Sequence, residues 1–280
     1  MDVKFLNLKF ESGNKTLNIE KDSDYKLIKI EGLESSDYEV NIEQNNNYDG
    51  GYINKKRVLP RDVFIEVDYK GLNKELERQK LIGFFNPKQQ GILTTNYCGI
   101  ERFILYEVES FKAPMDNLYA PLNFKVDLVC PDPYLKDYIT GEEISTWIGG
   151  WKFKFKLPFR FKQKGETKKN IYNSGHVETP MEVRFKGPAV NPSVINHTTR
   201  EFIKVNRELT SDDTLYITTG FGNKKVEIER EGKRVNAFNY IDLDSTFFSL
   251  VVGDNLMEYT TESLEPQSVE IRYRNRYLGV

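Results

Sequence analysis

The chain has 280 residues, enough for one large domain or two domains of ordinary size with substantial cores. Its 40 Lys and Arg residues nearly balance 42 Asp and Glu residues, giving a net charge of −2, whereas a dedicated nucleic-acid-binding protein usually carries a clear basic excess. Hydrophobic residues make up 39% of the chain and aromatic residues 13%, nearly all Phe and Tyr, so the composition excludes a disordered protein and favours strands.

The N-terminal half is predicted to consist mainly of strands. Apolar and polar residues alternate there with the period of a half-buried strand. The segments with this pattern are Val3–Leu8, Leu17–Ile19, Tyr25–Ile30, Val63–Tyr69, Gly91–Tyr97, Glu101–Phe111 and Phe124–Cys130. The first residues contain charges within this alternation, so they form neither the apolar core of a signal peptide nor a membrane span.

One helix is predicted, over Asn73–Phe85. Leu76, Leu81, Ile82 and Phe85 recur at helical spacing, and Asn73 stands where a side-chain cap is expected.

A polar, Gly-rich loop, Asn45–Lys56 (NNNYDGGYINKK), is predicted between the strands Tyr25–Ile30 and Val63–Tyr69. It cannot bury enough apolar surface to order itself, so we expect an arm that is either mobile or ordered by a neighbouring molecule. Exposed Tyr and Arg side chains favour protein interfaces. The candidate contact residues are Tyr48, Tyr52, Lys55, Lys56 and Arg57.

A domain boundary is predicted at Cys130–Tyr134 (CPDPY), where two prolines stop the preceding strand. The predicted domains are residues 1–133 and 134–280. The second half shows no helix pattern, and its short strands with turn signals predict a β-sandwich or jelly roll. These strands are Trp151–Phe161, Val177–Lys186, Phe202–Val205, Thr214–Thr218, Lys225–Arg230, Phe247–Val252 and Ser268–Tyr277, with a hairpin turn at Gly253–Asn255.

The first of these strands, WKFKFKLPFRFK at Trp151–Lys162, places its aromatic residues on one face and its cations on the other. Stacking on nucleic acid would need both on one exposed face, so the aromatic face is interpreted as core. Trp147 and Trp151 flank a Gly-Gly pair, and either they stack on a sugar ring or they cover the end of the sandwich.

No catalytic constellation stands out. Neither Cys98 nor Cys130 belongs to a CxxC pair, and His176 and His197 lie in predicted loops without metal-ligand spacing. HExxH, P-loop, GxSxG and GxGxxG motifs are absent from the sequence. Two acidic groups, Asp212-Asp213 and Asp242-Leu243-Asp244, lack the EF-hand pattern, and the second is interpreted as the solvated face of a strand. Selecting a glycosidase pair from 42 carboxylates would be arbitrary. We therefore expect no enzyme, no cofactor and no metal site.

A resemblance to a known family rests on four segments and on their order in the chain. They are FKVDLVCPDPY at Phe124–Tyr134, VETPMEVRFKGPAVNPSVIN at Val177–Asn196, FFSLVVGDNLMEY at Phe247–Tyr259 and SVEIRYRNRYLGV at Ser268–Val280. With RVLPRDVFIEVDYKG at Arg57–Gly71, they resemble the distal tail protein (Dit) family of long-tailed phages and prophages of Gram-positive bacteria.

The resemblance implies a structural protein of the virion tail tip, made in the host cytoplasm. The N-terminal domain would form a homohexameric ring, and the C-terminal domain would be a galectin-like β-sandwich. Its partners would be the tail tube protein, the tail-associated protein of the tip and, in many phages, receptor-binding components. The alternative from a different class is a carbohydrate-binding module that contacts host cell-wall glycans through Trp147 or Trp151. A glycan hydrolase is a third hypothesis, which turnover of wall polymers would distinguish.

Overall fold

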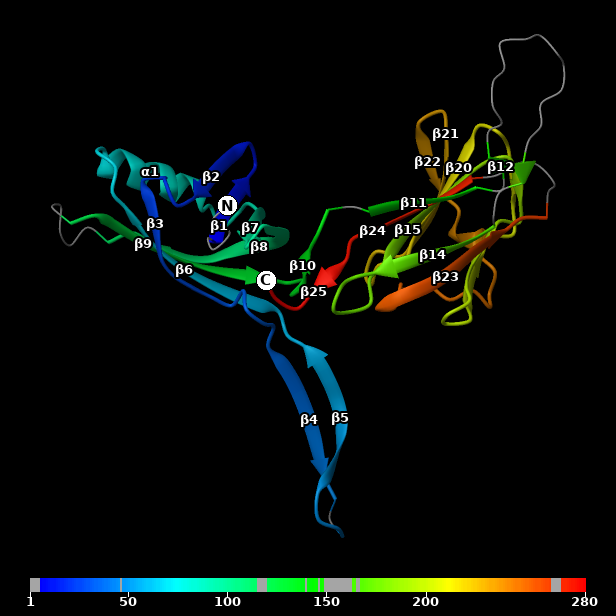
Figure 1. The fold of residues 1–280 in the computed structure, drawn as a ribbon, viewed down its shortest axis with the longest axis horizontal. Coiled ribbons are helices and arrows are strands. Elements are labelled where there is room, and N and C mark those ends of the chain that lie inside the picture. Colours follow the sequence, from blue (N-terminus) through cyan, green and yellow to red (C-terminus); the bar gives the residue numbers. More distant parts are fainter. Residues whose placement is uncertain are drawn as a thin grey trace. The chain divides into compact units, whose positions relative to one another are not determined.

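The computed structural model describes residues 6–45, 47–114, 120–138, 140–145, 147–148, 163–164, 167–262 and 268–280. The chain forms two compact units. Unit 1 comprises Met1–Asp137 and Tyr277–Val280, and unit 2 comprises Tyr138–Arg276 (Figure 1). The boundary therefore lies four residues beyond the predicted one, and residues 277–280 belong to unit 1.

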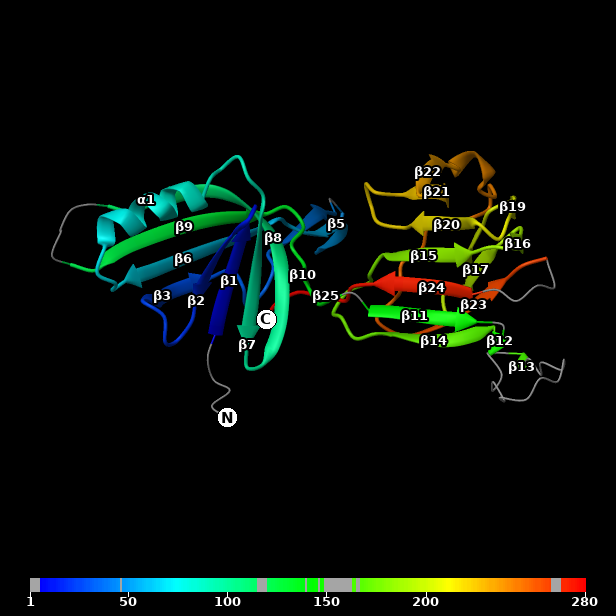
Figure 2. The same ribbon diagram turned by 90° about the horizontal axis from the view of Figure 1, so that it is seen from above.

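Unit 1 is built on one nine-stranded sheet with the central order β2-β1-β7-β8-β9-β6-β3. These strands are β1 (Leu6–Ser12), β2 (Lys15–Ile19), β3 (Tyr25–Glu31), β6 (Arg61–Tyr69), β7 (Gly91–Tyr97), β8 (Ile100–Lys112) and β9 (Leu122–Cys130). Two short strands, β10 (Leu135–Lys136) and β25 (Arg276–Tyr277), complete it. The long, curved β8 pairs with β7 through residues 100–106 and with β9 through residues 107–112, so it joins the two halves of the sheet (Figure 2). Both halves contribute to one hydrophobic core.

Alternation explains why these segments are strands. On β6 and β9 every second residue is buried, and the buried residues face each other in register, as in the pairs Ile65↔Val126 and Val67↔Phe124. Side chains of one parity therefore share one face and form the core. Cys98 and Gly99 connect β7 to β8 with φ angles of 53° and 83°, the positive pair that a type I′ hairpin turn requires.

The predicted helix is present as α1 (Lys74–Phe84), which packs on unit 1 through the buried Leu81 and Phe84 (Figure 1). Phe85 follows it, and its ring stacks on Phe111 with 5.2 Å between centroids. The expected side-chain cap is wrong: Asn73 makes no side-chain capping bond, and its backbone carbonyl begins the helix instead. Among the described residues, no helix has the length and apolar character needed to cross a bilayer.

The last residues of the chain are bound into unit 1. The buried Arg61 side chain donates to the carbonyl of Leu278, and the Val280 amide donates to the carbonyl of Leu33 at 3.1 Å. The Arg102 guanidinium lies 3.7 Å from the ring centroid of Tyr277. Residues 277–280 therefore pack as part of unit 1 although unit 2 precedes them in the chain.

Unit 2 is a β-sandwich. One sheet has the order β11-β24-β15-β20-β21-β22 and the other β14-β23-β17-β18. The first contains β11 (Thr140–Ser145), β15 (Met181–Lys186), β20 (Asp213–Thr218), β21 (Lys225–Arg230), β22 (Lys233–Asn236) and β24 (Ser268–Tyr273). The second contains β14 (Lys168–Asn173), β17 (Ser193–Asn196), β18 (Glu201–Lys204) and β23 (Gly253–Thr260). Small elements are β12 (Trp147–Ile148), β13 (Gln163–Lys164), β16 (Ala189–Val190), β19 (Glu208–Leu209) and the 3₁₀ turn η1 (Phe238–Tyr240).

The core of unit 2 is formed from side chains of both sheets, for example Val183 and Ile217 from one and Val194 and Met257 from the other. The predicted fold class, mainly β with one α-helix and a C-terminal sandwich, is confirmed. The strand predicted at Trp151–Phe161 lies outside the described residues.

Two predictions in unit 2 are wrong at one place. Phe247–Val252 is not a strand, and Gly253–Asn255 is not a hairpin turn but the start of β23, paired with β14. The side chain of Asn255 explains the shift. Its oxygen accepts from the Val251 amide at 3.0 Å and its nitrogen donates to the Val251 carbonyl at 2.8 Å. The chain thus turns before Gly253, whose φ is 88°, and Asn255 closes the turn from within the strand.

Candidate functional site: the β4–β5 arm

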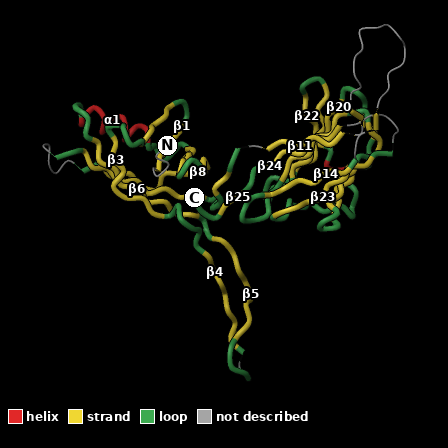
Figure 3. Tube along the Cα trace, in the orientation of Figure 1, coloured by secondary structure: helices red, strands yellow, loops and turns green. Residues whose placement is uncertain are grey.

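The segment predicted to be an arm is a β-hairpin inserted between β3 and β6. It consists of β4 (Tyr38–Gln44) and β5 (Gly51–Val58) and extends away from the sheet of unit 1 in Figures 1 and 3. The expectation of a loop throughout Asn45–Lys56 is therefore wrong for residues 51–56. Pairing with β4 satisfies backbone groups of this polar segment that a loop would leave to water.

The two faces of the arm differ in character. Residues opposite each other in an antiparallel pair share a face. The pairs Tyr38↔Val58, Val40↔Lys56 and Ile42↔Ile53 form one face, which we call the apolar arm face. It is exposed: the relative accessibilities of Ile42 and Ile53 are 59% and 61%.

The other face is polar and forms its own hydrogen bonds. Its pairs are Glu39↔Arg57, Asn41↔Lys55 and Glu43↔Tyr52. Arg57 bonds to Glu39, and the hydroxyl of Tyr52 donates to Glu43, which raises the pKa of the tyrosine. Because these ion pairs and hydrogen bonds are exposed to solvent, each adds little to the stability of the arm.

Among the residues that the structure describes, none of the arm belongs to the hydrophobic core of unit 1. A two-stranded hairpin with nothing packed on it is only marginally stable in water. A long, exposed apolar strand surface also invites pairing with another chain. The arrangement is therefore suited to contact with another molecule.

The predicted contact residues are divided between the two faces. Tyr52, Lys55 and Arg57 lie on the polar face, Lys56 lies on the apolar arm face, and Tyr48 lies in the turn with an exposure of 77%. The interface role of these five residues stays a prediction. The sequence reasoning missed the apolar residues Tyr38, Val40, Ile42 and Ile53. Alternation of YEVNIE at residues 38–43 was the signal that could have identified three of them.

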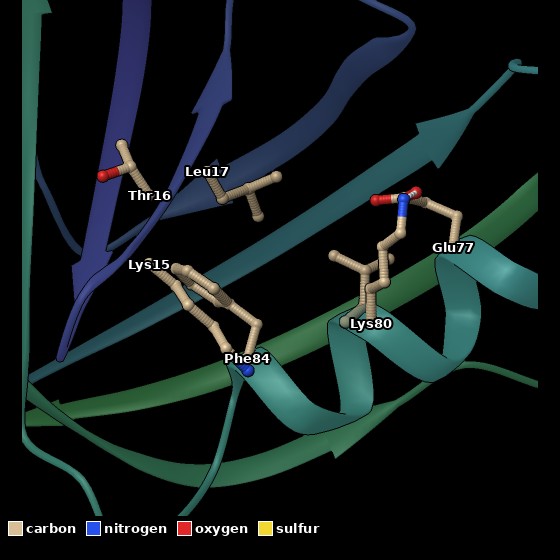
Figure 4. A pocket seen from close by; sticks show the side chains of 7 residues that line it. Lys15, Thr16, Leu17, Glu77, Lys80 and Phe84 are labelled. Carbon is tan, nitrogen blue, oxygen red and sulfur yellow. Dashed lines mark hydrogen bonds and ion pairs between the residues drawn. The ribbon is translucent and has the colours of Figure 1, made fainter.

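A second surface feature of unit 1 is a hollow of about 370 Å³ between β2 and α1 (Figure 4). Leu17, Leu81 and Phe84 supply its apolar lining, and Lys80 pairs with Glu77 at 3.0 Å on its rim. This hollow brings together no set of side chains with catalytic roles.

The other candidate residues do not converge on a site. His197 lies beside β17, with its Nε2 2.5 Å from Glu258, and His176 lies in an exposed loop. The interpretation of Asp242 and Asp244 as one face of a strand is wrong, because Asp242 precedes a turn and Asp244 lies in that turn. Within the described residues, no group of three or more His, Cys, Asp or Glu side chains could hold a metal ion. The side chains of Trp147 and Trp151 lie outside the described residues, so their predicted glycan role stays a prediction.

Comparison with known proteins finds a family model and solved structures to which this chain is similar. A family model described as "Siphovirus-type tail component, C-terminal domain" matches residues 174–277, which include most of the sandwich. The structure is similar to the crystal structure of SPP1 Dit (gp 19.1), with a TM-score of 0.69 and 13% identity over 97% of this chain and 99% of that one. That structure is described as a paradigm of the hub adsorption apparatus in phages that infect Gram-positive bacteria.

The chain is also similar to a chain of the phage P2 baseplate in its activated conformation with Ca, with a TM-score of 0.56 and 12% identity over 99% of this chain and 100% of that one. A search of the curated proteins finds no matching sequence. Residues 174–277 are thus similar to the C-terminal domain of a siphovirus-type tail component. The family model thus covers most of the sandwich, and the fold of the chain is that of SPP1 Dit and of the baseplate chain.

Proposed function

We propose that this protein is a ring-shaped hub of a phage, prophage or tailocin tail tip, which connects the tail tube to the tail-associated protein and to receptor-binding components. The family match and the similarity to SPP1 Dit support a structural role in a phage tail. The protein has no enzymatic activity in this proposal, and it is made in the host cytoplasm before it enters the virion.

The observation that most directly supports a ring-shaped oligomer is the exposed apolar arm face. A cyclic oligomer repeats one heterologous contact, in which a surface of each subunit meets a different surface of the next. An arm that cannot cover its own apolar face supplies one half of such a contact. We assign ring formation to the N-terminal domain, residues 1–133, which contains the arm, and we propose six subunits. The C-terminal domain, residues 134–280, then remains available to other partners.

Electron microscopy of the purified protein, combined with light scattering, tests this proposal. We expect rings with a central channel and a mass of about six times 32.7 kDa. Because assembly can depend on neighbours in the tail, the same measurements are made after co-expression with the tail tube and tail-associated proteins. A monomer under both conditions would overturn the ring.

A further inference from the structure

The edge strand β22 of unit 2 is open on its outer side. In the described part of the chain it pairs only with β21, through a register that runs from Glu227↔Asn236 to Arg230↔Lys233. All four residues of β22 are exposed. Its outward backbone N–H and C=O groups are therefore free to pair with another strand.

The corresponding edge of the facing sheet is covered. The carbonyl of Phe202 in β18 accepts from the Thr246 amide, and the carbonyl of Lys204 accepts from the Asp242 amide, both at 2.9 Å. The segment around residues 241–246 thus lies along β18. No described segment does the same for β22, so the two edges are treated differently by the fold.

A hollow lies beside the inner face of β22. Ile228 and Val235 are paired across β21 and β22 and therefore share this face. Ile228 is almost fully buried, whereas 66% of Val235 is exposed. Together with the buried Ala237 they form the apolar floor of a hollow of about 330 Å³. The inner face of the sheet thus extends beyond the residues that cover it.

The charged rim of this hollow contains one satisfied ion pair. Arg230 donates from Nε and Nη2 to the two carboxylate oxygens of Asp213, at 2.8 and 2.9 Å. This pairing holds the pKa of Asp213 well below its usual range and leaves no net charge from the two groups.

The remaining charges on the rim are two cations and one carboxylate, Arg207, Lys233 and Glu231. The Arg207 guanidinium lies 4.3 Å from the ring centroid of Tyr240, which orients it. Within the described residues neither Arg207 nor Lys233 forms an ion pair. The rim therefore favours a ligand that brings a carboxylate.

We propose that β22 binds an extended segment of a partner protein as an added strand. Side chains of a strand alternate between faces, so a residue opposite Val235 and one opposite Lys233 both point inward and are two positions apart. The first would contact the apolar floor, and the second would place a carboxylate beside Lys233. The partner segment is thus an apolar residue and an acidic residue separated by one position. Backbone pairing supplies affinity and the two side chains supply selectivity, as in other cases of strand addition.

Labelled heptapeptides and the full-length chain test this proposal by fluorescence anisotropy. The peptides are Thr-Thr-Val-Thr-Glu-Thr-Thr, the reversed order Thr-Thr-Glu-Thr-Val-Thr-Thr, and versions of both with Lys in place of Glu. We expect one order of the Glu peptide to bind at least tenfold more tightly than its Lys version. An antiparallel added strand favours Val before Glu, and a parallel one favours Glu before Val.

Charge exchange provides the decisive variant. K233E is expected to reverse the preference, so that the Lys peptide binds more tightly than the Glu peptide. V235D is expected to weaken both at least tenfold. K186E, a charge reversal at an exposed position of β15 in the same sheet, is the matched control and should change nothing. Bound peptide should also slow amide hydrogen exchange in residues 233–236.

Three outcomes would overturn the proposal. They are equal binding of Glu and Lys peptides, a K233E variant that keeps the original preference, and a peptide-free dimer that K233E dissociates, which would assign β22 to a second copy. The inference concerns unit 2 alone. If the protein forms no rings but still binds the peptides selectively, only the proposed hub is rejected. If it forms rings but does not bind the peptides selectively, only this site is rejected.

Discussion

Nη2 of Arg61 lies 2.5 Å from the carbonyl oxygen of Leu278, although the two residues are 217 positions apart in the chain. The same guanidinium donates to the carbonyls of Gly32 and Pro133 and to the hydroxyl of Ser36. Arg61 is only 2% exposed, and no described carboxylate bonds to it. Backbone carbonyls and one hydroxyl therefore satisfy a buried cation that holds three separate segments together.

Replacement of this arginine should destabilise unit 1. In R61M the acceptors around the side chain would be left buried without donors, at a cost of about 1–3 kcal/mol for each unsatisfied group. We expect a loss of about 3 kcal/mol or more in the free energy of unfolding, measured with urea. R57M at an exposed position of the arm is the control and should have little effect on that free energy. Equal stability of R61M and the wild type would show that the cluster contributes nothing.

Asp213 should make stability depend on pH. Besides Arg230, its carboxylate accepts from the amide and hydroxyl of Thr210, both at 2.8 Å. Because these contacts depress its pKa in the folded state, their stabilisation is complete above the ordinary carboxyl pKa of about 4 and is lost as the pH falls through the folded value. D213N should lower the free energy of unfolding by about 1–3 kcal/mol at pH 7.

Urea unfolding at pH 7 and near pH 2 should show that this difference shrinks in acid. The neighbouring exposed Asp212 gives the control D212N, for which we expect a small difference at both pH values. A D213N deficit that is equally large in acid would contradict the assignment.

The apolar arm face should control oligomerisation. I42D places a charge where an apolar contact with another subunit is proposed, so the oligomer should dissociate while the unfolding midpoint of the monomer stays unchanged. Light scattering over a concentration series measures the effect, and N41D on the polar face is the control. K56E combined with R57E should weaken assembly less, because only Lys56 lies on the apolar arm face.

Sequence patterns predicted the long strands of the unit 1 sheet, though not β4 and β5 of the arm, because period-two burial is a local property. The alternation from Phe124 to Cys130 alone identifies β9. Hydrogen bonds between residues far apart in the chain leave no such pattern in the sequence. The residues around Arg61 do not indicate that its side chain bonds to the carbonyl of Leu278. For the arm, the contact residues were chosen by their chemical type. The face on which each one lies depends on the register of β4 with β5 and on the bulge between Asn41 and Ile42.

The misplaced turn near Gly253 leads to another prediction. Asn255 is fully buried, and besides its two bonds to Val251 it accepts from Asn196 Nδ2 at 3.1 Å. N255D would place a second oxygen against carbonyl groups that now receive hydrogen bonds. We expect a loss of about 3 kcal/mol in the free energy of unfolding by urea. N223D, at an exposed position between β20 and β21, is the control; a similar small effect at both positions would show that the turn does not depend on Asn255.

The two cysteines should differ in reactivity. Cys98 is exposed in the β7–β8 turn, whereas Cys130 is buried and its burial raises the pKa of the thiol to about 12. An aromatic disulfide reagent at pH 8 should therefore label one thiol per native chain quickly, and two in denaturant. C98S should remove the fast reaction. Rapid labelling of two thiols in the native protein would show that β9 opens readily.

The return of residues 277–280 to unit 1 bears on how the protein folds during synthesis. Unit 2 is in effect an insertion between two parts of unit 1. The carbonyl of Leu33 is synthesised early, but the amide of Val280 that donates to it is synthesised only after unit 2. The chain thus has to be synthesised through the whole of unit 2 before unit 1 can form its final contacts, so the N-terminal unit, though made first, is finished last.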